Sequence, residues 1–286
     1  MDEDEEEEDK NLCPQIILLL IFIIFDIFLF RRSHLSKWPN TYYNTPKIIR
    51  DLYNFHIFSE YYEDLILYLI LFDIKKGFYI DVGAYDPIKV SVTKSFYLKG
   101  WRGINIEPQP GKIELFKKDR PDDINLQLAV GERKGKVTFY IDDQCSSVEE
   151  KYSKNYTNKT VVEMDTMSNI CKSYVKKGTK IDFCKIDVEG GEKSVLLGYD
   201  FINYRPKVFC IESTIPRSQK TNYELWEYIL INNDYSYIYS HGVNRFYVDN
   251  LIPGLMKRRI YIEKYLKKKY LKIIHKRRHK RRHKHH

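Results

Sequence analysis

The stretch GFYIDVGAYDP, residues 77–87, combines a short apolar run with an acidic residue and a glycine. Apolar runs of this length are typical of strands that are buried on both faces of a sheet. Gly83 lets the backbone pass close to a ligand, because it has no side chain. Open α/β sheets bind their ligands at the carboxyl ends of the strands. The stretch therefore predicts a buried strand that ends at a ligand-binding site.

A second apolar segment, RGINIE at residues 102–107, ends in Glu107. This glutamate follows Asp81 by 26 positions, about the length of one strand–helix–strand unit. A carboxylate at this place can accept hydrogen bonds from both ribose hydroxyls of a nucleoside. The turn DVGAYDP is not a GxGxxG motif, however, so the sequence does not indicate the pyrophosphate cradle of an NAD-dependent dehydrogenase.

A third apolar segment, IDFCKID at residues 181–187, continues as VEGGE and places three acids around two glycines. A helix that begins here would explain Glu189 and Glu192, since negative charge is favourable at a helix N-terminus. It does not explain Asp187, which follows an apolar strand and is poorly placed for a structural ion pair. We therefore expect Asp187 to bind a ligand or to react.

Helices and strands alternate along the rest of the body. A helix is expected at 60–72 and a closing hairpin at 235–239 and 245–248. Apolar segments predict strands at 77–83, 102–107, 124–130, 136–141, 181–187 and 207–213. Helical patterns lie between them at 91–99, 110–118, 163–176, 191–198 and 222–232. This alternation predicts an α/β fold with a doubly wound sheet.

The N-terminal part of the chain contains a charged run and then an apolar run. Residues 1–10 hold eight acidic side chains and one lysine, and residues 1–11 are expected to be a solvated acidic tail. Residues 12–30, LCPQIILLLIFIIFDIFLF, can cross about 30 Å of hydrocarbon as a helix. Two arginines follow, so the positive-inside rule places the body on the cytosolic side. The sequence predicts a single-pass membrane anchor, a linker at residues 31–56 and a cytosolic catalytic domain.

The C-terminal segment, residues 253–286, is strongly basic. From residue 257 onward it holds fifteen lysines and arginines against Glu263 alone, whereas the chain between the two charged ends is near neutral. Four of its residues could give a basic helix one apolar face: Ile262, Tyr265, Leu266 and Ile273. Clustered positive charge of this kind attracts anionic lipid or nucleic acid. The sequence predicts a polybasic tail that binds one of these partners.

The five cysteines have no CxxC spacing. Cys184 and Cys210 each lie in an apolar run that predicts an interior strand. We expect buried structural thiols, and the spacing indicates neither a disulfide framework nor a zinc site.

The order of the motifs is more specific than any one of them. The segments FYIDVGAYDP, SVTKSFYLKGWRGINIEPQP, LAVGERKGKVTFY, KIDVEGGE and VFCIES together resemble the FkbM family of methyltransferases. The later segments LWEYIL and HGVNRFYV resemble members that methylate sugar hydroxyls. The resemblance covers roughly residues 57–250 and suggests a methyltransferase domain at residues 57–252. It implies a class I, Rossmann-like methyltransferase fold with S-adenosyl-L-methionine as the methyl donor.

The resemblance also assigns roles to residues of the three motifs. It implies that Asp81, Gly83 and Ala84 line the methionine and ribose side of the cofactor, and that Glu107 binds the ribose hydroxyls. It further implies that Asp187 lies beside the methionine amine or the reacting centre, together with Glu189.

Methyl transfer to an alcohol requires that the hydroxyl proton be removed. The candidate bases are Asp187, Glu189, Glu212 and His241. Glu212 ends the strand VFCIES and should face the cofactor crevice, while His241 lies in the turn of SHGVNRFY. A divalent ion held by Asp187 and a neighbouring acid stays an open alternative, although no ligand spacing indicates a metal site.

The sequence as a whole predicts an O-methyltransferase that acts on a hydroxyl of a sugar or glycan. The main alternative is a membrane-anchored, polybasic scaffold that binds nucleic acid or anionic lipid and retains the methyltransferase fold. The four acids Asp81, Glu107, Asp187 and Glu189 weigh against a protein without catalytic activity. A Rossmann dehydrogenase is the third alternative.

Overall fold

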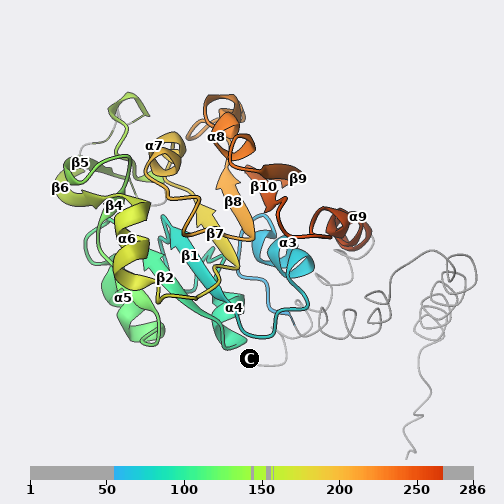
Figure 1. Ribbon diagram of the computed structural model, residues 1–286. Helices are drawn as coiled ribbons and strands as arrows, with labels where there is room; N and C mark the ends of the chain where they lie inside the picture. The colour runs from blue at the N-terminus through green and yellow to red at the C-terminus, as the bar shows by residue number, and fades with distance from the viewer. Residues whose placement is uncertain (1–54, 143–144, 153–155, 157, 267–286) are drawn as a thin grey trace, which may run out of the picture. The chain divides into compact units, whose positions relative to one another are not determined.

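The apolar segments of the sequence pair into a seven-stranded mixed sheet (Figure 1). The computed structural model describes residues 55–142, 145–152, 156 and 158–266. The strands of the large sheet are β1 (Phe78–Val82), β2 (Arg102–Ile106), β3 (Ile124–Leu126), β7 (Phe183–Ile186), β8 (Val208–Glu212), β9 (Tyr235–His241) and β10 (Asn244–Asp249).

The order of these strands is β3-β2-β1-β7-β8-β10-β9. The five strands from β3 to β8 are parallel, and the hairpin β9–β10 joins the sheet antiparallel to β8. The order reverses between β1 and β7, which is the topological switch point where open α/β sheets bind ligands. The expected doubly wound sheet and its closing hairpin are confirmed.

A smaller three-stranded sheet, in the order β4-β6-β5, was not expected. Its strands are β4 (Ala129–Val130), β5 (Gly135–Ile141) and β6 (Asn158–Asp165). The single strand predicted at 124–130 is wrong, because residues 124–126 pair with β2 and residues 129–130 pair with β6. The sequence pattern of a single segment does not show that its two halves pair with different strands.

Of the seven described α-helices, the first six lie near the six predicted helices but are shorter, and the seventh lies in the basic C-terminal segment. The seven are α3 (Glu63–Ile70), α4 (Lys94–Leu98), α5 (Lys112–Asp119), α6 (Met167–Tyr174), α7 (Glu192–Leu197), α8 (Glu227–Ile231) and α9 (Arg259–Leu266). The helix predicted from residue 163 begins later, because residues 158–165 form β6 instead. Thr166 caps α6, since its side-chain oxygen accepts a hydrogen bond from the Asn169 N–H at 3.1 Å.

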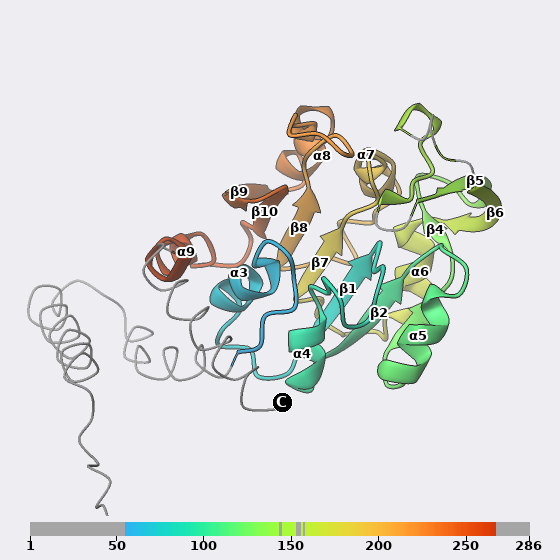
Figure 2. The ribbon, with the colours of Figure 1, turned by 180° about the vertical axis from the view of Figure 1, so that it is seen from behind.

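Helices cover both faces of the large sheet (Figures 1 and 2). Alternate strand residues pack against α6, α7 and α8 in one cluster that includes Ile80, Ile104, Cys184, Phe209, Ile170, Val195 and Leu230. On the opposite face, Phe183 contacts Phe96 of α4 and Trp101, with ring centroids 4.8 Å and 6.0 Å apart. Cys184 and Cys210 are fully buried free thiols, as expected.

The helix α9 is the only part of the predicted basic tail helix that the described residues contain. Its Ile262, Tyr265 and Leu266 are buried, which confirms the apolar face for these three positions. Ile273, the expected anchor at 12–30, most of the linker at 31–56 and the tail beyond residue 266 lie outside the described residues. Within residues 55–266 as described, no helix is long and apolar enough to cross a membrane.

Candidate active site

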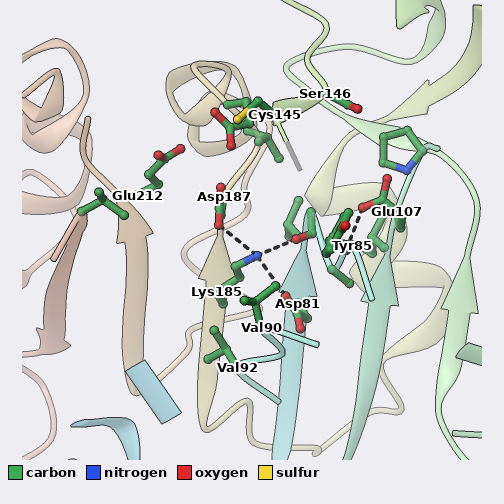
Figure 3. A pocket seen from close by; sticks show the side chains of 18 of the residues that line it. Asp81, Tyr85, Val90, Val92, Glu107, Cys145, Ser146, Lys185, Asp187 and Glu212 are labelled. Carbon is green, nitrogen blue, oxygen red and sulfur yellow. Dashed lines mark hydrogen bonds and ion pairs between the residues drawn. The ribbon is translucent and has the colours of Figure 1, made fainter. Parts of the chain in front are cut away.

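A cavity of about 340 Å³ opens at the carboxyl ends of β1, β2, β7 and β8 (Figure 3). This volume lies in the range of about 300–1,000 Å³ that is usual for small-molecule sites. The cavity lies at the switch point of the sheet, where β1 and β7 are neighbours. The fold therefore places a ligand-sized cavity where the sequence motifs predict one.

The register of the sheet aligns the acidic ends of three strands. One level of the sheet holds the paired residues Val82, Ile106, Ile186 and Ile211. The next residues along these strands include Glu107, Asp187 and Glu212, and all three line the cavity. Because the strands are parallel, their acidic residues point out of the same edge (Figure 3).

Gly83 allows the turns after β1 and β7 to approach each other. Its φ is +73°, and a Cβ at this position would overlap the backbone carbonyl oxygen of Asp187. Its N–H donates to the Ile106 carbonyl oxygen at 3.0 Å, which ties the turn to β2. A side chain at residue 83 is excluded by both sterics and backbone conformation.

Glu107 is buried beneath two backbone donors. The Tyr85 N–H donates to its Oε2 and the Gln109 N–H donates to its Oε1, each at 2.8 Å. Burial raises the pKa of Glu107, although these two hydrogen bonds oppose the shift. Each carboxylate oxygen can accept more than one hydrogen bond, so Glu107 is held in place and can still bind hydroxyl groups in the cavity.

Lys185 joins the acids of β1 and β7. Its Nζ lies 3.5 Å from Asp81 Oδ1 and 3.4 Å from Asp187 Oδ2, and it donates to the Gly83 carbonyl oxygen at 2.5 Å. Burial alone would lower the pKa of Lys185, but the charges of Asp187 and Asp81 outweigh burial and raise it. The expectation that Asp187 is poorly placed for a structural ion pair is therefore wrong.

Three acids gather on the β8 side of the cavity. Carboxylate oxygens of Asp187, Glu189 and Glu212 lie within 4.8 Å of one another, and these residues could hold a metal ion. Burial raises the pKa of Glu189 to about 8, with the charge of Asp187 adding to the effect. Burial likewise raises the pKa of Glu212 well above its usual range, and the charges of Asp187 and Glu189 add to it. Asp187, Glu189 and Glu212 are called the acid cluster below.

Comparison with protein families identifies the domain. The family described as "Methyltransferase FkbM domain" matches residues 81–239, which is more than half of the chain. The chain belongs to the FkbM methyltransferase family. The FkbM resemblance of the motifs is thereby confirmed. The family match and the strand order also agree with the class I methyltransferase fold that the motifs imply.

Two solved structures are similar to this FkbM methyltransferase. One is methyltransferase FkbM from Methylobacillus flagellatus, with 17% identity over 61% of this chain and a TM-score of 0.40. The alignment spans only 44% of that Methylobacillus chain. The other is magnesium protoporphyrin IX methyltransferase from Synechocystis with bound SAM, with 11% identity, a TM-score of 0.32, and 84% of this chain and 99% of that one covered. No curated protein matches the chain.

Most of the predicted site residues of this FkbM methyltransferase meet at the cavity. The lining includes Asp81, Gly83, Ala84, Glu107, Asp187, Glu189 and Glu212. Ala84 is buried and packs against Ile113 and Phe116 of α5.

His241, at the end of β9, is not among the residues that line the described cavity. Its ring lies 6.0 Å from that of Tyr62, and burial lowers its pKa.

Sequence reasoning missed three other residues of the cavity wall. Lys185 had a detectable signal, because it is a charged residue inside the apolar strand FCKI. Cys145 was expected to be a buried structural thiol, but it lines the cavity and is only partly buried, and burial raises its pKa to about 11. Arg217 lies in the loop after β8 and forms an ion pair with Asp142. No pattern in the sequence distinguishes Arg217 from a solvated loop residue.

Proposed function

We propose that this FkbM methyltransferase uses S-adenosylmethionine as the methyl donor and methylates a hydroxyl group of a sugar or glycan. The observation that carries the choice of donor is the charge of the cavity. Seven carboxyl side chains line it, whereas Lys185 and Arg217 are its only basic residues within the described chain. Both basic residues are already paired with carboxylates.

A cavity with this excess of acids favours a positively charged ligand and repels phosphate groups. The charge supports a donor with a sulfonium and an ammonium group over NAD or another pyrophosphate-containing cofactor. The turn after β1 also lacks the GxGxxG motif that binds a pyrophosphate, so the motif and the charge lead to the same conclusion. The dehydrogenase alternative is therefore disfavoured by both sequence and charge.

The residues present fit this donor. Glu107 is fixed by the N–H groups of Tyr85 and Gln109 and keeps oxygen lone pairs for two ribose hydroxyls. The turn at Gly83 brings backbone close to the cavity without a side chain in the way. Asp81 Oδ1 is buried without a hydrogen-bond partner among the described residues, and its nearest cation is Lys185. We assign Asp81, Gly83, Ala84 and Glu107 to the donor side.

S-adenosylmethionine supplies, when bound, a methyl group on a positively charged sulfur that an oxygen nucleophile can displace. The chain must then orient the acceptor hydroxyl and accept its proton. Asp187, Glu189 and Glu212 all face the cavity and are the candidates for this step. His241 becomes a weaker candidate, since it lies outside the lining.

The acceptor class rests on the resemblance of the later motifs and on the polarity of one part of the cavity wall. Hydrogen-bonding side chains that carry no charge line this wall, namely Thr214, Ser218, Gln219 and Asn244. Groups of this kind suit an acceptor that is rich in hydroxyls. A sugar or glycan is therefore the acceptor that we propose.

Titration of the full-length protein with S-adenosylhomocysteine tests the donor. We expect micromolar affinity and a loss of about tenfold in Glu107→Gln, because one of the two carboxylate oxygens becomes a donor nitrogen. The matched control is Glu114→Gln on α5, whose side chain is 64% exposed and should not change the affinity. No binding by folded wild-type protein would refute the donor assignment.

The acceptor is tested with labelled S-adenosylmethionine and a panel of glycans. Mass spectrometry of the products should show a methyl group on a sugar hydroxyl. Methylation of a peptide, lipid or small metabolite instead would keep the donor assignment and refute the acceptor class.

A further inference from the structure

The acid cluster has the composition of a metal site, although its residues do not follow a known metal-ligand spacing in the sequence. Asp187 follows β7, Glu189 lies two residues later, and Glu212 is the last residue of β8. Each can provide one oxygen, and these oxygens lie within 4.8 Å of one another. We propose that the acid cluster binds a hard divalent cation of the class of Mg²⁺ and Ca²⁺.

The state of Glu212 is evidence for a ligand that is independent of the number of acids. Only 7% of this residue is exposed. Its Oε1 accepts a hydrogen bond from Thr214 Oγ1 at 3.2 Å, but its buried Oε2 accepts no hydrogen bond from a donor among the described residues. A buried carboxylate oxygen without a partner is costly, and an ion in the acid cluster would give it one.

The protein itself supplies little positive charge to the acid cluster. Lys185 is shared between Asp187 and Asp81, with Nζ-to-oxygen distances of 3.4 Å and 3.5 Å. In the part of the chain that the structure describes, neither Glu189 nor Glu212 forms an ion pair. If all three acids were ionised, a share of one lysine would leave an excess of negative charge in the acid cluster. A divalent cation would balance this excess.

The size of the acid cluster and its ligand type both indicate a hard ion. Oxygen atoms on opposite sides of Ca²⁺ are about 4.6–5.2 Å apart, because each bond is about 2.3–2.6 Å long. The oxygens of the acid cluster lie within 4.8 Å of one another and so fit this span, and Mg²⁺ would need a modest contraction. Carboxylates without histidine are typical ligands of Mg²⁺ and Ca²⁺ rather than of softer metals.

All three acids also line the cavity, so a cation held by them would face the cavity. A hydroxyl bound to such an ion loses its proton more readily. This catalytic consequence rests on the proposed methyl transfer. The binding of the ion does not, and it can be measured without any methyl donor.

Calorimetric titration of Ca²⁺ into the full-length protein is the direct test. Ca²⁺ is chosen because the histidine-rich end of the chain, residues 275–286, prefers softer metals. We expect one saturable site with a dissociation constant on the order of 10⁻⁵ to 10⁻³ M. Glu212→Gln should weaken this site at least tenfold. The matched control is Glu60→Gln, an exposed acid that lines the same cavity outside the acid cluster and should change the affinity less than twofold.

The comparison of variants separates this site from weak binding by the acidic residues 2–9. Ca²⁺ isotherms that coincide for the wild type and Glu212→Gln would overturn the proposal. If Glu212→Gln does not fold, Asp187→Asn replaces it, since that side chain is 35% exposed and tolerates change. Methyl transfer that persists in a chelator, together with no Ca²⁺ site, would refute the cation and leave the proposed function standing. A Ca²⁺ site without methyl transfer would do the reverse.

Discussion

Lys185 and Asp81 are paired directly across the parallel strands β7 and β1, and Lys185 Nζ lies 3.5 Å from Asp81 Oδ1. The two side chains are only 8% and 2% exposed, so both charges are withdrawn from water. Thr93 Oγ1 also donates to Asp81 Oδ2 at 2.8 Å, which holds the carboxylate from the other side. The ion pair thus holds the ends of β1 and β7 together where both residues line the cavity.

The change Lys185→Met should destabilise the protein strongly. It leaves Asp81 buried without its cation, and removal of one partner of a buried ion pair costs about 3–5 kcal/mol. The measurement is the free energy of unfolding from urea titration. The matched control is Lys136→Met, because Lys136 pairs with Glu163 on the surface, with side chains 71% and 65% exposed. That variant should change stability by less than about 0.5 kcal/mol, and an equal loss in both variants would contradict the argument.

The change Gly83→Ala should be far more harmful than the same change at Gly111. Both glycines have positive φ, +73° and +82°, so both variants carry a similar backbone strain of about 1 kcal/mol. Only at Gly83 does the new Cβ overlap the Asp187 carbonyl oxygen, whereas nothing lies within 4 Å at Gly111. We expect Gly83→Ala to lose several kcal/mol of stability, or to fail to fold, and Gly111→Ala to lose about 1 kcal/mol. Thermal melts of the two variants check this, and similar melting temperatures would refute the steric explanation.

The sequence predicted the acidic edge of the sheet because each strand carries its own signal. Apolar segments ending in Glu107, Asp187 and Glu212 lie at the same level once the strands are parallel. The partners across the sheet could not be predicted. Lys185 and Asp81 are 104 residues apart, and their contact depends on β7 being the neighbour of β1.

Two other features depend on strand pairing and register rather than on the local sequence pattern. Residues 124–130 look like one strand, but they divide between two sheets according to which strand each half meets. The place of His241 depends on the register of the β9–β10 hairpin, in which it pairs with Asn244. Asn244 lines the cavity and His241 does not. A single sequence carries no signal for such a register.

The change Asp187→Asn should slow methyl transfer by about 100-fold or more. The carboxylate is lost from the acid cluster, whether it accepts the hydroxyl proton or holds a cation there. Stability should change little, because the lost attraction to Lys185 is offset by lost repulsion from Glu189 and Glu212. Rates with labelled S-adenosylmethionine, S-adenosylhomocysteine affinity and melting temperature should be measured together, with Glu114→Gln as control. Wild-type turnover in Asp187→Asn would remove this residue from the mechanism.

Glu63 should make the protein less stable as the pH rises. It begins α3, its Oε1 accepts a hydrogen bond from Asn244 Nδ2 at 2.7 Å and its Oε2 accepts one from the Tyr61 N–H at 2.9 Å. Burial raises its pKa from 4.5 to about 7 in spite of opposing hydrogen bonds. The folded state therefore holds this proton more tightly than the unfolded chain does. Its contribution to stability is fully present below pH 4.5 and is lost as the pH rises through about 7.

The change Glu63→Gln removes this titration and keeps the shape of the side chain. The free energy of unfolding of the variant minus that of the wild type should increase by on the order of 1–3 kcal/mol between pH 5 and pH 8. The reason is that the wild type must bury a charge at the higher pH. Urea titrations at intervals across this range measure the difference, and Glu60→Gln, an exposed neighbour, should give a difference that does not vary with pH. A constant difference for Glu63→Gln as well would show that Glu63 is already charged in the folded protein at pH 5.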